Sequence, residues 1–404
     1  MSELVIERLG HLGDGIAKGP VFVPLTLPGE LVAGEVTGDR METPRILRPS
    51  EDRVSAPCRH FRACGGCSLQ HASDPFVASW KSDVVRAALS AHGIDIAVAR
   101  IDTSPERSRR RAVFSGRRTK KGVLVGLHGR ASGTIVEVPD CRIMSPAIMA
   151  ALPALEALVA AGASRKAEMS LAVIETERGA DVAVRGGKPL DQALRIGLSE
   201  VVGTFGLTRL YWDGEQIAQD APIQRFGRAT VIPPAGAFLQ ATHEGEAALL
   251  AYVRQAVGKS KKIADLFAGC GTFSLPLAEG AEIHAVESEA AMLSALDRGW
   301  RAAPGLKLVT TEARDLFRRP LLPDELDKFN AVVLDPPRAG CEAQVEELAH
   351  SKVSKVVSVS CNPVTFARDS KILIDAGYSI SDLIVVDQFR WSPHIEAAAT
   401  FTRL

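Results

Sequence analysis

Aromatic residues and long apolar runs are scarce in this sequence. The 404 residues include only 4 Trp, 3 Tyr and 14 Phe, which argues against a protein that binds single strands mainly by stacking bases. The most apolar window, residues 147–163, contains Pro153 and Glu156 and falls short of the ~20 residues that a membrane span needs, so it predicts a core helix. The stretch MSELVIERLG has charges where a signal peptide is apolar, and we expect a cytoplasmic protein without membrane contact.

Net charge is absent as well, since Lys and Arg together number 48 and Asp and Glu also number 48. A neutral total excludes no nucleic-acid function, because binding depends on where the charges lie. Residues 107–121 (RSRRRAVFSGRRTKK) are rich in Arg and Lys and contain no acidic residue. Charge alone leaves two interpretations of this segment, a solvated basic face or a contact with RNA phosphates.

Four of the seven cysteines form a spaced set. Cys58, Cys64 and Cys67 lie in one Gly-containing loop, and Cys141 follows a predicted strand. In a reducing compartment such a set indicates metal binding or catalysis rather than disulfides. Four thiolates suit an iron–sulfur cluster or zinc. Zinc ribbons usually have two C-x2-C pairs and this loop has one, which favours the cluster; zinc and a metal-free loop remain alternatives.

The length and the strand pattern predict a multi-domain α/β protein. Residues 1–50 contain short strand-like runs cut by Gly and Pro, which is typical of a small β-barrel. Residues 51–235 are expected to form a mixed β-rich domain that includes the cysteine loop and a helix over 76–92. From 236 to 404, short apolar strands alternate with helices, which predicts a doubly wound, Rossmann-like domain.

Individual elements can be predicted within these domains. VLVGLH is expected to pair with TIVEV, and MSLAVIE with ADVAVR, as hairpins. The apolar runs that predict a buried parallel sheet are KKIADLF, EIHAVE, LKLVTT, NAVVLD and KVVSVS. Helices are expected over 342–350 and 364–376, and two more strands, LIVVDQF and EAAATFTRL, follow.

A glycine-rich turn marks a predicted cofactor site. Asp265, Gly269 and Gly271 follow a strand and open a helix, and Glu287 ends the next strand, where a carboxylate can bind ribose hydroxyls. The loop lacks both a third Gly and a Walker lysine, so an adenosine ligand without a pyrophosphate, such as S-adenosylmethionine, fits best. Asp315 is a candidate partner for the adenine edge. The alternatives are an ordinary tight turn and a solvated loop carboxylate.

A predicted reactive centre lies at the same sheet edge. Asp335 ends one strand in LDPPRAG, and Cys361 ends the next in VVSVSCNP. The helix expected after Cys361 has a partially positive N-terminus, which predicts a lowered thiol pKa. Glu396 begins the last predicted strand, either as a general base or as an edge charge. A structural, buried cysteine is the alternative for Cys361.

These residue types suit methylation at carbon 5 of uracil, which is a poor nucleophile. A thiolate that adds to C6 turns the ring into an enolate, whose C5 can attack a sulfonium methyl group. A base must then remove the C5 proton so that the thiol can leave. Cys361, Glu396 and the Gly269 turn would supply the three parts in one pocket.

Taken together, the motifs resemble those of the bacterial RNA 5-methyluridine methyltransferases, which act on 23S ribosomal RNA and on transfer RNA. The resemblance covers nearly the whole chain, and residues 10–32 look like the family's RNA-binding TRAM domain. It implies that Cys58, Cys64, Cys67 and Cys141 hold a 4Fe-4S cluster, which the ribosomal branch carries. It therefore favours 23S ribosomal RNA as the partner of a monomeric enzyme, with a transfer RNA uridine as the alternative.

The resemblance also implies roles for individual residues. It assigns Cys361 in SCNP as nucleophile and Glu396 in HIE as base. The implied S-adenosylmethionine contacts are Gln240, Phe267, Gly269, Thr272, Glu287, Asp315 and Asp335. Thr242, Thr272 and Asp315 stand where the family commonly has Asn.

Beside a methyltransferase, the basic segment acquires a hypothetical role in RNA phosphate contact, through Arg109, Arg110, Arg111, Arg117 and Arg118. Three competing functions remain: an amino-group methylase, which needs no nucleophilic Cys; a cytosine-C5 methylase; and a non-catalytic, metal-stabilised RNA-binding protein. Radical chemistry is disfavoured, because such enzymes are expected to have a C-x3-C-x2-C spacing that is not found here.

Overall fold

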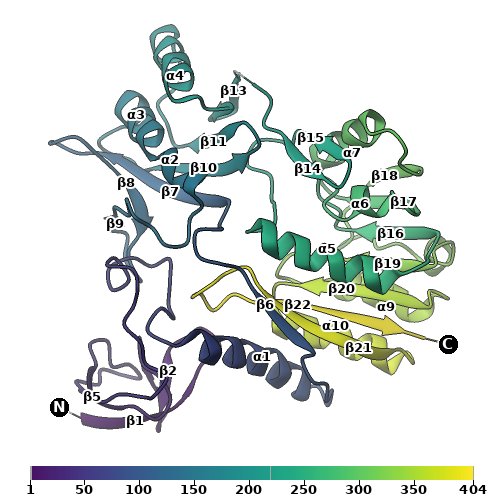
Figure 1. The fold of residues 1–404 in the computed structure, drawn as a ribbon, viewed down its shortest axis with the longest axis horizontal. Coiled ribbons are helices and arrows are strands. Elements are labelled where there is room, and N and C mark those ends of the chain that lie inside the picture. Colours follow the sequence, from purple (N-terminus) through teal and green to yellow (C-terminus); the bar gives the residue numbers. More distant parts are fainter. Residues whose placement is uncertain (1, 219, 404) are drawn as a thin grey trace.

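A computed structural model describes residues 2–218 and 220–403, which form three sheet-based units and a small hairpin (Figure 1). The first unit is a five-stranded antiparallel sheet in the order β3-β2-β1-β4-β5. Its strands are β1 (Ser2–Leu9), β2 (Gly15–Ala17), β3 (Val21–Val23), β4 (Leu31–Gly34) and β5 (Arg45–Arg48). Edge strand β3 also bonds to the segment after β4, since Phe22 N donates to Asp39 O at 2.8 Å. The sheet therefore curls back on itself around a small apolar core.

The second unit is a seven-stranded sheet in the order β13-β12-β11-β10-β7-β8-β9. Both predicted hairpins are confirmed, as β8 pairs with β9 and β10 pairs with β11, each antiparallel. The apolar window forms two core helices, α2 (Pro146–Ala150) and α3 (Leu152–Gly162). The other elements are α4 (Gln192–Phe205), β7 (Arg111–Arg118), β8 (Val123–His128), β9 (Ile135–Val136), β10 (Met169–Thr176), β11 (Gly179–Arg185), β12 (Arg209–Trp212) and β13 (Glu215–Ala218).

The third unit contains the predicted α/β domain, an eight-stranded sheet in the order β18-β17-β16-β19-β20-β22-β21-β6. Strands β16 to β20 are parallel, and β22 lies antiparallel between β20 and β21. The strands are β16 (Lys262–Leu266), β17 (Glu282–Glu287), β18 (Val309–Ala313), β19 (Ala331–Leu334), β20 (Lys355–Ser360), β21 (Ser379–Asp387) and β22 (Glu396–Thr402). The helices are α5 (His243–Val257), α6 (Ser274–Leu277), α7 (Ala290–Ala302), α8 (Pro323–Leu326), α9 (Glu342–His350) and α10 (Pro363–Asp375).

Three segments outside residues 236–404 also pack with this third unit. Helix α1 (Asp74–Ser90) packs against α10, and β6 (Arg100–Thr103) pairs with β21 as the parallel edge strand. The hairpin of β14 (Gln224–Phe226) and β15 (Ala229–Val231) packs into the same apolar core as α7. Strand β6 has the sequence RIDT, and such a short polar edge strand lacks the apolar run by which buried strands are recognised.

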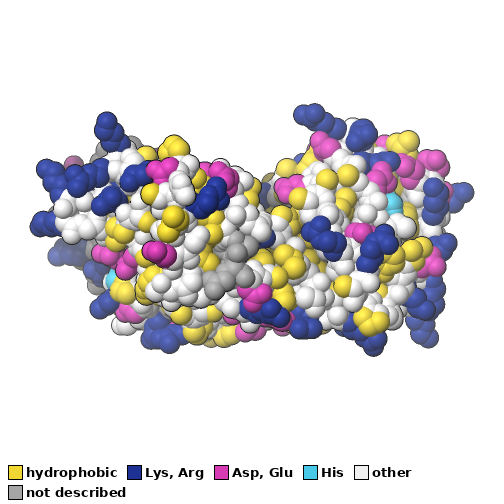
Figure 2. Space-filling view, turned by 90° about the horizontal axis from the view of Figure 1, so that it is seen from above, with side chains coloured by type: hydrophobic (Ala, Val, Ile, Leu, Met, Phe, Trp, Pro, Cys, Tyr) yellow, Lys and Arg dark blue, Asp and Glu magenta, His cyan; other side chains and the backbone are white. Residues whose placement is uncertain are grey.

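Two further features of the molecule are the distribution of basic side chains over its surface and the character of its helices. A saddle separates two lobes, and Lys and Arg side chains gather toward their outer ends (Figure 2). Basic surface is therefore not confined to residues 107–121. Within the part of the chain that the structure describes, no helix combines the length and the apolar character needed to cross a membrane.

A buried ion pair fastens α1 to the turn between β21 and β22. Lys81 and Asp387 are almost fully buried, with Nζ 2.5 Å from Oδ1. The same ammonium donates to His394 O at 2.9 Å and to Phe389 O at 3.2 Å. Burial lowers the Lys81 pKa while the Asp387 charge raises it. One cation thus fixes both sides of a turn that precedes Glu396.

We expect Lys81→Met to destabilise the protein by about 3–5 kcal/mol, because it leaves the Asp387 carboxylate buried without its cation. Chemical denaturation would measure the loss as a lower midpoint at unchanged slope. The double variant Lys81→Met/Asp387→Leu should recover much of the stability, since it removes the unpaired charge. A double variant that is less stable than Lys81→Met alone would contradict this account.

Candidate active site

The carboxyl ends of the parallel strands meet at one edge of the third sheet, which contains a cavity of about 610 Å³. Its walls come from chain segments as distant as residues 109 and 396. The residues predicted from the sequence that line it are Arg109, Arg111, Gln240, Phe267, Gly269, Thr272, Glu287, Asp315, Asp335, Cys361 and Glu396. The structure therefore brings the predicted cofactor contacts, nucleophile and base together in one cavity.

The glycine turn after β16 has the strained backbone that close ligand approach requires. Gly269 and Gly271 have φ of 56° and 98°, and Phe267 has φ of 65°, which is uncommon for a residue with a side chain. A Cβ at Gly271 would lie 2.9 Å from the Leu296 side chain, so only glycine fits there without rearrangement. The Phe267 ring, 5.5 Å from that of Phe317, forms an aromatic wall.

Glu287 is held in place by backbone donors. Its Oε2 accepts from Gly269 N at 3.1 Å, and its Oε1 accepts from Ser288 N at 2.7 Å and Glu289 N at 3.1 Å. The carboxylate at the end of β17 is thus fixed against the glycine turn at the end of β16. Asp315 accepts from Phe317 N at 3.0 Å, and its side chain is 42% exposed.

A chain of amide side chains orients the acidic centre. Gln240 Nε2 donates to Asp335 Oδ2 at 3.2 Å, and Gln388 Nε2 donates to Gln240 Oε1 at 2.6 Å. Gln388 Oε1 in turn accepts from Ala241 N at 2.6 Å. Sequence reasoning missed Gln388, although a Gln directly after the apolar run of β21 could have drawn notice. This residue is 2% exposed and fixes the amide orientation of Gln240.

Burial keeps the two central carboxyl groups protonated to unusually high pH. The pKa of Asp335 is raised to about 7 by desolvation and by the nearby Asp265 charge. The pKa of Glu396 is raised to about 8, mainly by desolvation and then by Asp335, while a hydrogen bond from Gln388 opposes the rise. Asp265 itself accepts from Ser274 Oγ at 2.5 Å, and its Oδ1 has no hydrogen-bond partner among the described residues.

The thiol environment corrects the expectation of a lowered pKa. Burial raises the pKa of Cys361 to about 12, and the Glu396 and Asp335 charges add to the rise. The N-terminus of α10 is close, but Asn362 Oδ1 already accepts from Val364 N at 3.1 Å. Desolvation and two carboxylates act against ionisation, so Cys361 is a neutral thiol in the unliganded protein.

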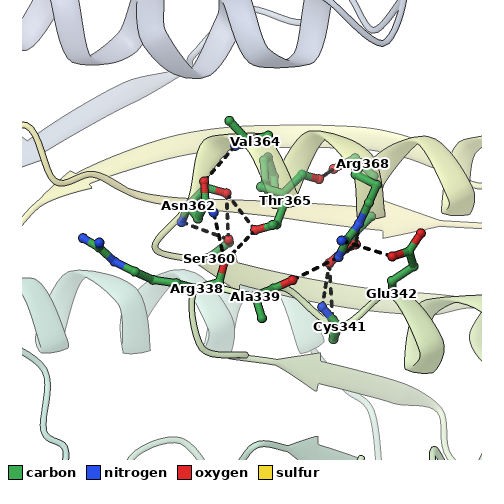
Figure 3. Close-up of polar contacts among 12 residues, drawn as sticks. Arg338, Ala339, Cys341, Glu342, Ser360, Asn362, Val364, Thr365 and Arg368 are labelled. Atoms are coloured by element: carbon green, nitrogen blue, oxygen red, sulfur yellow. Dashed lines mark hydrogen bonds and ion pairs between the residues drawn. The ribbon is translucent and has the colours of Figure 1, made fainter. Parts of the chain in front are cut away.

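Hydrogen bonds join the loop after β19 to the start of α10 (Figure 3). Asn362 Nδ2 donates to Arg338 O at 2.9 Å, and Thr365 Oγ1 donates to the same oxygen at 3.3 Å. Arg368 donates to Ala339 O at 3.2 Å. The loop that follows Asp335 is therefore bonded to the segment that follows Cys361, at the start of α10.

The basic segment divides into side chains with different environments. Arg109 and Arg111 line the cavity, with the Arg111 guanidinium 4.2 Å from the centroid of the Phe238 ring. Arg110 is 1% exposed, with a nitrogen 2.5 Å from Glu246 Oε2 and its Nε donating to Gln240 O at 2.9 Å. The expected phosphate contact of Arg110 is therefore wrong, because its guanidinium is buried in an internal ion pair. Arg117 and Arg118 lie farther along β7, exposed and half-buried.

The four spaced cysteines are free thiols. Cys64 and Cys67 are buried, and Cys67 has its pKa raised to about 12 by desolvation and then by the charges of Cys141, Cys64 and Cys58. The thiols are thus close enough to influence one another. Within residues 2–218 and 220–403, however, no group of three or more His, Cys, Asp or Glu side chains is arranged to hold a metal ion. The described side chains thus do not form a ready metal site, and the cluster stays a prediction.

We expect Glu396→Gln to change how the stability of the unliganded protein depends on pH. The native state binds the Glu396 proton up to about pH 8, against an ordinary value of 4.5, so wild-type stability falls as pH rises between these values. The variant lacks this loss, and its melting temperature relative to wild type should rise by at least about 2 °C from pH 5 to pH 9. Thermal melts at both pH values measure this, with exposed Glu289→Gln as control. A difference that is independent of pH would refute it.

Comparisons with known proteins agree with this geometry. A family model described as tRNA (Uracil-5-)-methyltransferase matches residues 302–404. An uncharacterized RNA methyltransferase of Brucella suis biovar 1 is 45% identical over 405 residues, covering 99% of this chain and 98% of the relative. A 23S rRNA (uracil(1939)-C(5))-methyltransferase, RlmD of Halomonas elongata, is 32% identical over 431 residues, covering 98% of this chain and 88% of the relative.

A solved structure shares the fold over the whole chain. The tRNA (uracil-54, C5)-methyltransferase of Pyrococcus abyssi, in complex with S-adenosyl-L-homocysteine, has a TM-score of 0.78 at 22% identity and covers 99% of this chain and 100% of that chain. With full-length relatives above 30% identity and this fold, the chain belongs to the family of S-adenosylmethionine-dependent RNA uracil-C5 methyltransferases.

Proposed function

We propose that this protein methylates carbon 5 of a uridine in 23S ribosomal RNA, with Cys361 as covalent nucleophile and Glu396 as base. The observation that carries the mechanism is one cavity lined by Cys361, Glu396, Asp335 and the Gly269 turn. The 23S target is supported by the full-length relative of that specificity. A transfer RNA uridine is the alternative, since the family model and the solved structure carry that description.

The cavity fits S-adenosylmethionine as methyl donor. It has the size of a small-molecule site and presents the fixed Glu287 carboxylate, the glycine turn and the Phe267 ring on one side. When bound, this donor supplies an electrophilic methyl group. We propose that it is held by Gln240, Phe267, Gly269, Thr272, Glu287, Asp315 and Asp335.

Cys361 has to lose its proton before it can attack C6. With a pKa of about 12, very little thiolate exists in the unliganded cavity. A cation bound beside Asp335 and Glu396 favours the thiolate, because opposite charge stabilises the ionised form. Nucleophile activation is therefore coupled to occupation of the cavity.

Glu396 is suited to removing the C5 proton at the end of the reaction. With a pKa of about 8 in the unliganded protein, Glu396 is a stronger base than an ordinary glutamate once it has ionised, and its pKa lies close to neutral pH. Its side chain is 2% exposed, so the base acts away from bulk water, and the Gln388 amide helps to fix its direction. In the proposed order, Cys361 first adds to C6, the methyl group is then transferred to C5, and Glu396 finally removes the C5 proton so that the thiol can leave.

RNA that contains 5-fluorouridine tests the covalent step. Wild-type protein with S-adenosylmethionine should form an adduct at Cys361 that survives denaturing electrophoresis, because fluorine at C5 cannot leave as a proton. Cys361→Ser should form no adduct, whereas Cys341→Ser, altered at a buried cysteine outside the cavity, should behave as wild type. On ordinary RNA, Glu396→Gln should accumulate a methylated adduct. Methylation by Cys361→Ala would favour the amino-group methylase instead.

Mapping 5-methyluridine in cellular RNA, with and without the protein, identifies the substrate. Loss of one modified uridine from 23S ribosomal RNA supports the proposal, and loss from transfer RNA favours the alternative.

We further propose that exposed Arg117 and half-buried Arg118, together with a TRAM-like first sheet, contact RNA phosphates. We also propose that the protein acts as a monomer in the cytoplasm.

We also propose that Cys58, Cys64, Cys67 and Cys141 hold a 4Fe-4S cluster, because four free thiols come close enough to perturb one another. No ready metal arrangement exists among the described residues, so metal analysis is decisive. Protein purified without oxygen should contain about four iron and four sulfide ions per chain, and Cys67→Ser should contain far fewer. Zinc in their place, or metal-free protein that folds and methylates normally, would refute the cluster.

A further inference from the structure

A second cavity lies beside the first and shares the reactive thiol with it. This second cavity, which we call the side groove, has a volume of about 610 Å³. Arg338, Cys361 and His394 line both cavities, and Arg338 Nη2 lies 2.6 Å from His394 Nδ1. The Arg338–His394 pair thus stands at the boundary between the proposed uridine site and the side groove.

The walls of the side groove are largely apolar and come from three parts of the fold. The end of β1 and the turn after it contribute Leu9, His11 and Leu12, and helix α1 contributes Trp80, Val84 and Ala87. The segments around Cys361 and Glu396 contribute Pro363, Val364, Pro393 and Ile395. Leu12 is 68% exposed and Val364 is 64% exposed, although both are large and apolar. Exposed apolar side chains that face one groove mark an interaction site.

Polar groups in the side groove indicate the chemistry of its ligand. Arg8 and Arg338 supply positive charge, against the single carboxylate of Asp83, which is partly engaged by Arg86 at 3.1 Å. Trp80 is 8% exposed and lines the groove, while its indole Nε1 is buried away from solvent. The exposed character of the groove is therefore apolar and positively charged.

We propose that the side groove binds the nucleotide adjacent to the target uridine, with its base between Leu12 and Val364 and its phosphate toward Arg338. This inference rests on the proposed function, because a uridine joined to Cys361 has its neighbours in the chain just outside the first cavity. Unstacked bases are flat and apolar on their faces, which matches the apolar walls, and a phosphate matches the positive charge of Arg8 and Arg338. The groove would hold the RNA loop open while the uridine occupies the active site.

Truncation of the two exposed side chains tests this role without disturbing the core. For Leu12→Ala/Val364→Ala we expect RNA affinity to fall and KM for RNA to rise about tenfold, in the range of one lost base contact, with kcat and affinity for S-adenosylhomocysteine unchanged. Ile196→Ala, at a comparably exposed apolar site on α4 outside both cavities, is the matched control. Wild-type KM and affinity in Leu12→Ala/Val364→Ala would overturn the proposal.

The RNA side of the contact can be removed separately. The probe is a short RNA hairpin that contains the mapped uridine, with the nucleotide before it or the nucleotide after it made abasic. If no uridine has been mapped, oligouridylate takes the place of the hairpin, and only binding is measured. One abasic position should weaken wild-type binding about tenfold and have little further effect in Leu12→Ala/Val364→Ala, because both changes remove the same contact. Fully additive losses would refute the groove contact.

Binding and methylation together separate the two proposals. RNA binding that weakens in the variants, without methylation by wild type, would retain the groove and reject the proposed function. Methylation by the wild type, together with fully additive losses of binding from the abasic RNA and the double variant, would retain the proposed function and reject the groove contact. A wild-type protein that binds none of these RNAs would overturn both.

Discussion

The parallel direction of β16 to β20 is the constraint on which the site depends. Parallel neighbours place all their carboxyl ends at one edge, so Asp265, Glu287, Asp335 and Cys361 have to meet although they are separated in the sequence. Insertion of β22 antiparallel beside β20 brings the first residue of β22, Glu396, to the same edge. Chemistry that needs several groups in one pocket is thereby assembled from strand ends, without long loops.

Desolvation at that edge sets the charge state of the site. Burial raises the pKa of Asp335 and of Glu396, the Asp335 charge adds to the rise at Glu396, and both carboxyl groups disfavour ionisation of Cys361. An empty cavity consequently contains a nearly inert thiol, which limits reaction with stray electrophiles. In the proposed mechanism, a bound cationic donor would lower the pKa of both carboxyl groups and of the thiol, because opposite charge stabilises an ionised form, so donor binding and ionisation of the site would be coupled.

Sequence reasoning succeeded where a polar residue lies at or just beyond the carboxyl end of an apolar strand. Asp265, Glu287, Asp335 and Cys361 all have that position, and period and strand order suffice to bring them together. It failed where the outcome depends on side-chain direction. Arg109, Arg110 and Arg111 are identical in type, yet successive residues entering β7 point to opposite faces, so Arg110 turns inward to Glu246 while its neighbours reach the cavity. The thiol pKa and the role of Gln388 depend on distant partners and were likewise out of reach.

The place of β22 in the sheet has a consequence for biosynthesis. It follows every other strand in the chain, yet it occupies the sixth of eight places, between β20 and β21. Until β22 has been synthesised, the facing edges of β20 and β21 therefore lack their partner, and neither Glu396, the proposed base, nor the turn anchored by Lys81 is in position. A nascent chain emerging among ribosomes thus has no complete active site, and modification of RNA begins only when synthesis has delivered the last strand.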